Sequence, residues 1–280
     1  MAKVIAEIGI NHNGQLEIAK RLISMAKEAG AHAVKFQVRD VDTVYAGQLL
    51  NPRNDGNPYG WKTMGDQKRG IEFSIEQYKQ LNVFCELIGM PWFVSAWDRE
   101  SFAEHYSMFD QPYNKIASAM LTNLEFCEDV ATTKKFTFIS TGGSTLEQID
   151  ACIAIFKKHD VPICIMHCVA QYPCPDTSLN LNMLHTLRTR YPFAEIGYSG
   201  HEVGLHPSVM AIAMGARWIE RHITLDRSMY GSDQAASMEF HGLQQLCKIA
   251  RDADAILGTG HKEVLPKEAE CMKKLRYFEV

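Results

Sequence analysis

The sequence predicts a single α/β domain of the (β/α)8 (TIM) barrel type. Three observations support this prediction: eight short apolar runs typical of strands, helix-length amphipathic segments between them, and a length of 280 residues. One such barrel takes about 250 residues, so it would use most of the chain. A doubly wound open sheet is the alternative, but it would not normally reach eight strand–helix units.

Most of the expected strands lack a strict alternation of apolar and polar residues, as is typical of parallel strands covered on both faces. In chain order they are Lys3–Ile8, Ala33–Gln37, Trp92–Ala96, Tyr113–Ala117, Phe136–Ser140, Ile163–Cys168, Glu195–Tyr198 and Trp218–His222. Helical periodicity is clearest in Leu16–Ala29, which Gly30 would end. The other expected helices are Ile75–Leu87, Leu121–Thr132, Thr145–Lys157, Leu179–Thr189, Pro207–Met214 and Phe240–Leu257.

The connection from Asp40 to Ser74 is unusually long. Between Asn51 and Gly60 it carries Asn, Asp, Gly and Pro in a density that disfavours helix and strand. A loop of this size in a compact domain is usually functional, so we expect it to cover an active site.

Composition excludes several classes of protein. Lys and Arg total 29 against 33 Asp and Glu, so a basic footprint for nucleic acid is missing. No apolar run approaches the roughly 18–20 residues of a membrane helix, and Glu7 comes too early for a secretory signal. Eight cysteines in a chain of this size favour free thiols in a reducing, cytoplasmic location.

Polar side chains close nearly all of the expected strands, where a barrel places its chemistry. Each alone is more typical of a solvated or capping residue, but their convergence on one rim indicates a site. They are Glu7, Lys35, Gln37, Ser95, Lys115, Ser118, Ser140, Thr141, His167, Ser199, His201, Glu220 and His222.

Two kinds of ligand would suit this set. Lysines and hydroxyls bind phosphate and carboxylate, and the run from Ser140 to Ser144 could turn backbone N–H groups to an anion or simply cap the next helix at Ser144 or Thr145. His201 and His222 end consecutive strands and suit a divalent metal that polarises a carbonyl. Two histidines fit a core role equally well, so both interpretations stay open here.

Seven motifs follow one another between residue 6 and about residue 239. They are Ala6–Gly14 (AEIGINHNG), Val34–Gln37 (VKFQ), Lys115–Ser118 (KIAS), Ile139–Gly143 (ISTGG), His167–Pro173 (HCVAQYP), Gly197–His201 (GYSGH) and Gly215–His222 (GARWIERH). Together and in this order they resemble the N-acetylneuraminate (sialic acid) synthase family. The resemblance implies a barrel that condenses phosphoenolpyruvate with an aldose, often an N-acetylated hexosamine, to a nine-carbon 2-keto-3-deoxy sugar acid and phosphate.

The resemblance also implies roles for individual residues. Mn2+ or Mg2+ would be held by His201 and His222, and Glu7 would act at the reacting centre and its water. Tyr172 and Asp233 would face the sugar. The phosphate and carboxylate would be bound by Lys35, Gln37, Lys115, Ser118, Ser140 and Ser199. Ser95 and Thr141 are added as binding candidates because they lie at strand ends.

The chain departs from the family pattern mainly on the sugar side. Met120 stands where Glu is frequent, Gln234 where His is common, and Gly200 where Asp often precedes the metal histidine. The expected barrel spans residues 1–262, and residues 263–280 resemble the start of the linker to the family's C-terminal antifreeze-like domain. Any homo-oligomer would then use barrel surfaces.

Two alternatives remain. One is a synthase of the octulosonate or heptulosonate phosphate type, which uses a phosphorylated aldose and for which Arg39, Arg53 and Arg69 are candidate ligands. The other is a non-catalytic barrel that binds phosphoenolpyruvate or a sugar acid.

Overall fold

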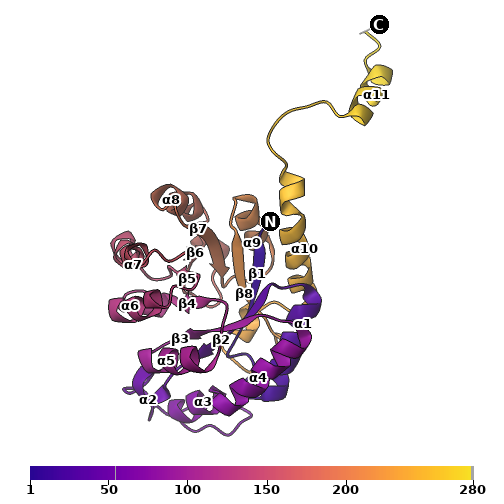
Figure 1. Cartoon of the computed structure of the whole chain (residues 1–280). Coiled ribbons are helices and arrows are strands. Elements are labelled where there is room, and N and C mark those ends of the chain that lie inside the picture. Colours follow the sequence, from indigo (N-terminus) through magenta and orange to yellow (C-terminus); the bar gives the residue numbers. More distant parts are fainter. Residues whose placement is uncertain (54, 279–280) are drawn as a thin grey trace.

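A computed structural model describes residues 1–53 and 55–278, and it shows eight parallel strands arranged as a barrel with helices around them (Figure 1). The strands are β1 (Lys3–Gly9), β2 (Ala33–Val38), β3 (Trp92–Ala96), β4 (Asn114–Ile116), β5 (Thr137–Ser140), β6 (Ile163–Cys168), β7 (Glu195–Gly200) and β8 (Trp218–His222). The expected barrel is confirmed. Asn54 of the long connection and residues 279–280 of the expected tail lie outside the described residues.

The helices, apart from α11, cover the outside of the strands. They are α1 (Leu16–Ala29), α2 (Val41–Val44), α3 (Met64–Ile71), α4 (Ile75–Ile88), α5 (Arg99–Met108), α6 (Leu124–Thr132), α7 (Leu146–Lys158), α8 (Met183–Arg190), α9 (His206–Ala213), α10 (Phe240–Leu257) and α11 (Pro266–Leu275). Within the described chain, no helix is both long enough and apolar enough to cross a membrane.

The hydrogen-bonded strand order is β3-β2-β1-β8-β7-β6-β5-β4. Its two end strands, β3 and β4, lie beside each other and close the ring. There a side chain takes the place of a backbone ladder, because Gln111 Oε1 accepts a hydrogen bond from the Val94 N–H at 3.0 Å.

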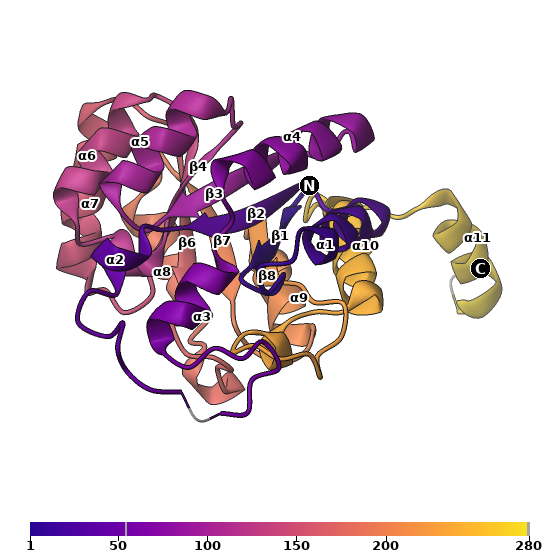
Figure 2. The ribbon, with the colours of Figure 1, turned by 90° about the horizontal axis from the view of Figure 1, so that it is seen from below.

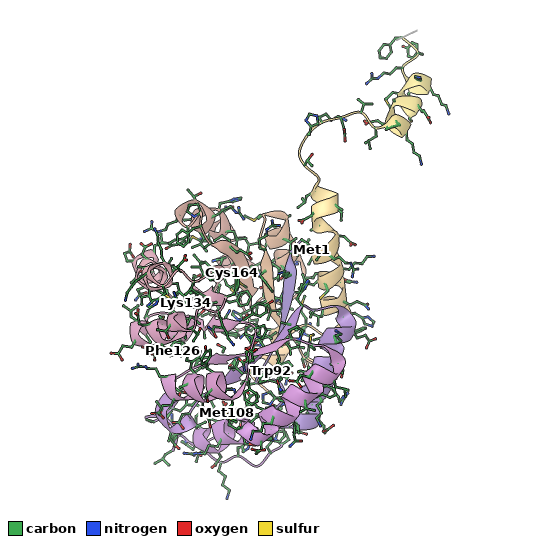
Figure 3. The ribbon with its side chains drawn as sticks, viewed as in Figure 1. Met1, Trp92, Met108, Phe126, Lys134 and Cys164 are labelled. Carbon is green, nitrogen blue, oxygen red and sulfur yellow. The ribbon has the colours of Figure 1, made fainter. Side chains whose placement is uncertain are left out.

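Alternation along the strands explains how an apolar core and a polar site share the barrel interior. Successive strand residues point to opposite faces, so residues two apart share a face. Ile5, Phe93 and Trp218 belong to a buried apolar cluster inside the ring, where the Phe138 and Trp218 ring centroids lie 4.7 Å apart. Two residues further on, Glu7, Ser95 and Glu220 point the same way, which places a polar layer directly above an apolar floor. Figure 3 shows the side chains filling the barrel around Cys164.

Several helices differ from the expected ones. The connection after β2 contains α2 and α3, because Thr63 and Asp66 form a capping box that starts α3. The helix α5 was not expected, since His105 is its only buried residue and it lacks a clear apolar stripe. Helix α6 begins three residues later than expected, at Leu124, where Asn123 caps it after a 3-10 turn.

The C-terminal helix α11 stands apart from the barrel in both views (Figures 1 and 2). Helix α10, which packs on α1 and α9, ends at Leu257, and the expected boundary at residue 262 falls in the segment that leads to α11. In the described chain α11 has no buried residue, so its packing contributes nothing to the core.

Deleting residues 259–280 is therefore expected to change Tm by less than about 2 °C, because the free energy of unfolding depends on buried contacts. A matched deletion that starts at residue 240 removes the buried Leu243, Leu246 and Ala250 of α10 and should prevent folding. Thermal unfolding followed by circular dichroism compares the two. A large fall in Tm for the shorter deletion would show that α11 does stabilise the barrel.

Candidate active site

A cavity opens at the C-terminal ends of the strands. All but three of the residues expected in the site line it, and they come from all eight strands or the loops that follow them. The lining residues are Glu7, Lys35, Gln37, Ser95, Trp97, Lys115, Ala117, Ser118, Ala119, Ser140, Ala170, Tyr172, Ser199, His201, Glu220 and His222.

Two lysines and two glutamates form the floor of this cavity. Lys35 Nζ lies 2.8 Å from Glu7 Oε2 and 3.7 Å from Glu220 Oε1. Lys115 Nζ lies 3.1 Å from Glu220 Oε2 and donates to Ser140 Oγ at 2.6 Å. The strand register causes this proximity, since Glu7 pairs with Lys35 on one side and with His222 on the other.

These four buried charges compensate one another. Burial alone would lower the pKa of Lys35, but the carboxylates of Glu220 and Glu7 outweigh it and raise that pKa. Burial alone would raise the pKa of Glu220, but Lys115 and Lys35 outweigh it and lower that pKa to about 2. Both lysines are thus already paired with carboxylates, so an anionic ligand would have to replace a carboxylate as their partner.

The end of β1 packs closely against the site because Gly9 has no side chain. Its φ of +54° favours glycine. A Cβ here would lie 3.1 Å from Glu7 Oε1, 3.1 Å from His222 Cε1 and 3.2 Å from Gln37 Nε2. Gln37 Nε2 in turn donates to Glu7 Oε1 at 2.8 Å, which fixes the second carboxylate oxygen.

The two histidines lie side by side, with ring centroids 5.5 Å apart. His201 Nδ1 is 3.0 Å from the Val169 carbonyl, which only accepts, so this nitrogen carries the proton and Nε2 keeps its lone pair. Burial, with the adjacent His222, lowers the pKa of His201 to about 3, so the ring is neutral. Among the described residues His222 Nδ1 has no hydrogen-bond partner and lies 3.8 Å from Asp233 Oδ2.

A divalent metal fits this pair. Metal-binding histidines are neutral and commonly use their other nitrogen to donate to a carbonyl, as His201 does. Within the described chain no group of three or more His, Cys, Asp or Glu gathers around a possible ion position. Two protein ligands would leave most coordination positions open to substrate oxygens and water. The Tyr172 ring lies 4.0 Å from the His201 ring and covers one side of this position.

Three expected site residues lie outside the cavity lining. His167 Nε2 lies 2.7 Å from the Leu179 carbonyl. The Thr141 hydroxyl donates to the Met166 carbonyl at 3.2 Å, so it holds neighbouring strand ends together. Asp233 Oδ2 lies 3.8 Å from His222 Nδ1 at the edge of the site. The helix after β5 is capped by Thr145, and the Gly142 N–H donates to Ser118 Oγ at 3.1 Å.

Apart from three alanines, sequence reasoning left two lining residues without a role. Glu220 was noted at a strand end, and its position two residues before His222 signals that both share the inner face. Trp97 directly follows β3, and its place depends on the bond from its N–H to the Val38 carbonyl, for which the local sequence holds no signal.

The three residues that depart from the family pattern each have identifiable neighbours in the structure. Gln234 donates to the Asn11 carbonyl at 3.1 Å. A Cβ at Gly200 would come within 2.4 Å of Glu202 Oε2, because Glu202 forms a fully buried ion pair with Arg221. Met120 lines a second cleft, which shares Trp97 and Ala119 with the main cavity.

The arginines considered for a phosphorylated acceptor do not line the cavity described above. Arg53 contacts Asp55 and Tyr230, and Arg69 pairs with Asp42. Arg39 is buried beside Gln37.

Comparison with known proteins gives concordant matches. The model of the NeuB family matches residues 22–262. The chain is 36% identical to human N-acetylneuraminate-9-phosphate synthase over 97% of its own length and 76% of the relative's. It is 30% identical to N,N'-diacetyllegionaminic acid synthase of Campylobacter jejuni, with 98% and 82% covered. The crystal structure of the Leptospira borgpetersenii N-acetylneuraminic acid synthetase in complex with citrate superposes with a TM-score of 0.84 at 28% identity, covering 99% of this chain and 92% of that one.

Proposed function

Because the chain belongs to the NeuB family, we propose that the cavity at its strand ends is where phosphoenolpyruvate and an aldose react. The protein is a phosphoenolpyruvate-dependent transferase that forms a carbon–carbon bond and yields a nonulosonic-type sugar acid. The observation that carries the assignment of the cavity is the convergence of two buried lysines and two adjacent histidines on one space. That space sits where barrel enzymes hold their substrates.

Phosphoenolpyruvate would occupy the lysine side of the cavity. Its phosphate and carboxylate need cations and hydroxyl donors, which Lys35, Lys115 and Ser140 supply together with Ser118, Ser199 and Gln37. Ser95 has a buried hydroxyl without a hydrogen-bond partner among the described residues, so it is free to donate to the same ligand. Before the anion binds, the Ser199 hydroxyl donates to Glu220 Oε1 at 3.2 Å, so it would have to turn from Glu220 to the ligand.

The reaction joins carbon 3 of phosphoenolpyruvate to the aldehyde carbon of the open-chain acceptor. The aldehyde oxygen takes up a proton, water adds to the electron-poor carbon 2, and phosphate leaves as the C–O bond breaks. Glu7, held by Lys35 and Gln37, is placed to take the proton that this water loses. The net change converts phosphoenolpyruvate, aldose and water to the 2-keto-3-deoxy acid and phosphate.

His201 and His222 would hold Mn2+ or Mg2+, with Asp233 near the second ring. Such an ion polarises the aldehyde carbonyl and stabilises negative charge on its oxygen. The chain's own contribution is to keep the His201 ring oriented through the Val169 carbonyl and to cover the position with Tyr172.

The acceptor is an aldose of the N-acetylmannosamine type, and a phosphorylated form of it is the second candidate. Phosphoenolpyruvate contributes carbons 1–3 of the product, so a phosphate on carbon 9 comes from carbon 6 of a hexose. The human relative is named for a 9-phosphate product, whereas the Campylobacter relative is named for a product without phosphate. The finding that favours the phosphorylated form is the higher identity to the human protein.

Mass spectrometry of products tests both acceptors. The protein would be incubated with phosphoenolpyruvate, Mn2+ and matched neutral and 6-phosphorylated N-acylhexosamines, and phosphate release would be followed in parallel. We expect a product whose mass equals acceptor plus phosphoenolpyruvate plus water minus phosphoric acid. If phosphoenolpyruvate binds but releases no phosphate in the presence of any of the aldoses, the protein would instead be a non-catalytic barrel.

We also propose that the protein works in the cytoplasm and that any homo-oligomer uses barrel surfaces. All eight cysteines are free thiols in the structure, which suits a reducing compartment. Chemical cross-linking and light scattering of the full chain test the oligomeric state.

A further inference from the structure

Arg39 lies just beyond the end of β2 and is 8% exposed. It is not one of the residues that line the cavity, yet it contacts two that do. Its NH2 group donates to Gln37 Oε1 at 2.6 Å. Its guanidinium carbon lies 4.7 Å from the centroid of the Trp97 ring, a distance at which a cation is attracted to an aromatic face.

The other side of the guanidinium holds the segment that follows β2. Its NH1 group donates to the Tyr45 hydroxyl at 2.9 Å, just after α2. Its Nε lies 2.8 Å from Glu72 Oε1, at the end of α3. One planar cation thus joins the long connection between β2 and α4 to the wall of the cavity.

The contact with Gln37 decides which way its carboxamide points. The oxygen and nitrogen ends of a carboxamide have nearly the same shape, so only their hydrogen-bond partners distinguish them. Arginine donates and never accepts, which forces Oε1 toward Arg39 and Nε2 toward Glu7. With the carboxamide reversed, its oxygen would face Glu7 Oε1 at the present Nε2 distance of 2.8 Å and repel it.

We propose that Arg39 is a positioning residue for the condensation: it fixes the Gln37 carboxamide, and through it the Glu7 carboxylate, while supporting Trp97. This inference rests on the proposed function of the cavity. Lysine cannot replace arginine here, because a single ammonium group lacks the planar fork that reaches Gln37, Tyr45 and Glu72 at once.

The test compares Arg39→Lys and Arg39→Met with Gln37→Ala and with both double variants. Positioning residues one contact away from the reacting groups commonly change activity about 10–100-fold. We expect each single variant to lower kcat by that factor. If Arg39 acts through Gln37, the double variants should be little worse than Gln37→Ala alone. Tyr45→Phe, which keeps the contact between Arg39 and Gln37, should stay within about threefold of the wild type.

Two further measurements separate positioning from general stability. Arg190→Met removes an exposed ion pair with Asp150, neither residue of which lines the cavity, and should leave kcat unchanged. Circular dichroism and Tm identify any variant that fails to fold. Calorimetric titration with phosphoenolpyruvate alone should show weaker binding in Arg39→Lys and in Gln37→Ala, and equal binding in Arg190→Met.

The possible failures are distinguishable. A folded wild type that releases no phosphate from phosphoenolpyruvate with any aldose would refute the proposed function. An active wild type in which Arg39→Lys keeps full kcat, or in which the Arg39 and Gln37 effects multiply independently, would refute the positioning role and leave the function intact.

Discussion

Replacing His201 with alanine is expected to abolish the metal dependence together with the activity, with a loss in kcat/KM of about 10³-fold or more. The substitution removes one of the two imidazoles that face the cavity. It also removes the ring that Tyr172 covers and that the Val169 carbonyl orients. The remaining His222 would offer a single protein nitrogen, too few to retain a divalent ion at micromolar concentrations.

Calorimetric titration with Mn2+ and steady-state phosphate release measure the two effects separately. His206→Ala is the matched control, because His206 is an exposed histidine paired with Asp176. It should bind Mn2+ and turn over as the wild type does. If His201→Ala turned over normally, the assignment of the metal position would be wrong.

Replacing Lys115 with methionine is expected to weaken phosphoenolpyruvate binding by about 10–100-fold, the value of a charge-assisted hydrogen bond. The same change removes the closer of the two lysines around Glu220. Breaking a buried ion pair costs about 3–5 kcal/mol of stability, and the cost here should be smaller because Lys35 still compensates Glu220.

A double variant separates these two effects. Lys115→Met combined with Glu220→Gln removes both charges, so the free energy of unfolding should recover while ligand binding stays weak. Urea unfolding measures the first quantity and calorimetry the second. Phosphoenolpyruvate binding of wild-type strength in Lys115→Met would place the anion elsewhere in the cavity.

The sequence was informative about the barrel because strand and helix periods differ and alternate eight times. The part of the site that is built from strand ends could also be predicted from the sequence, since parallel strands bring residues such as Lys35, Lys115 and His201 to one rim. The direction of some side chains could be predicted from the sequence as well. The two-residue spacing of Glu220 and His222 indicates a shared face, although the role of Glu220 as the partner of both lysines appears only in three dimensions.

The features that could not be predicted from the sequence depend on tertiary contacts. Helix α5 lacks a buried stripe, so no periodic pattern marks it. The sequence does not show that the Thr141 hydroxyl is engaged, but in the structure it donates a hydrogen bond to the Met166 carbonyl. Arg39 belongs to a strand end like its neighbours, yet its four partners come from three separate segments of the chain. Such convergence is set by packing and leaves no local signature.

The closure between β3 and β4 is built differently from the rest of the ring. Every other neighbouring pair of strands is joined by a backbone ladder, whereas here the Gln111 side chain accepts the Val94 N–H. Lys35 lies on β2, which is hydrogen-bonded to β3, and Lys115 lies on β4, on the other side of the closure. The two lysines that flank Glu220 therefore reach it from opposite sides of the one pair of neighbouring strands, among the described residues, that no backbone ladder joins.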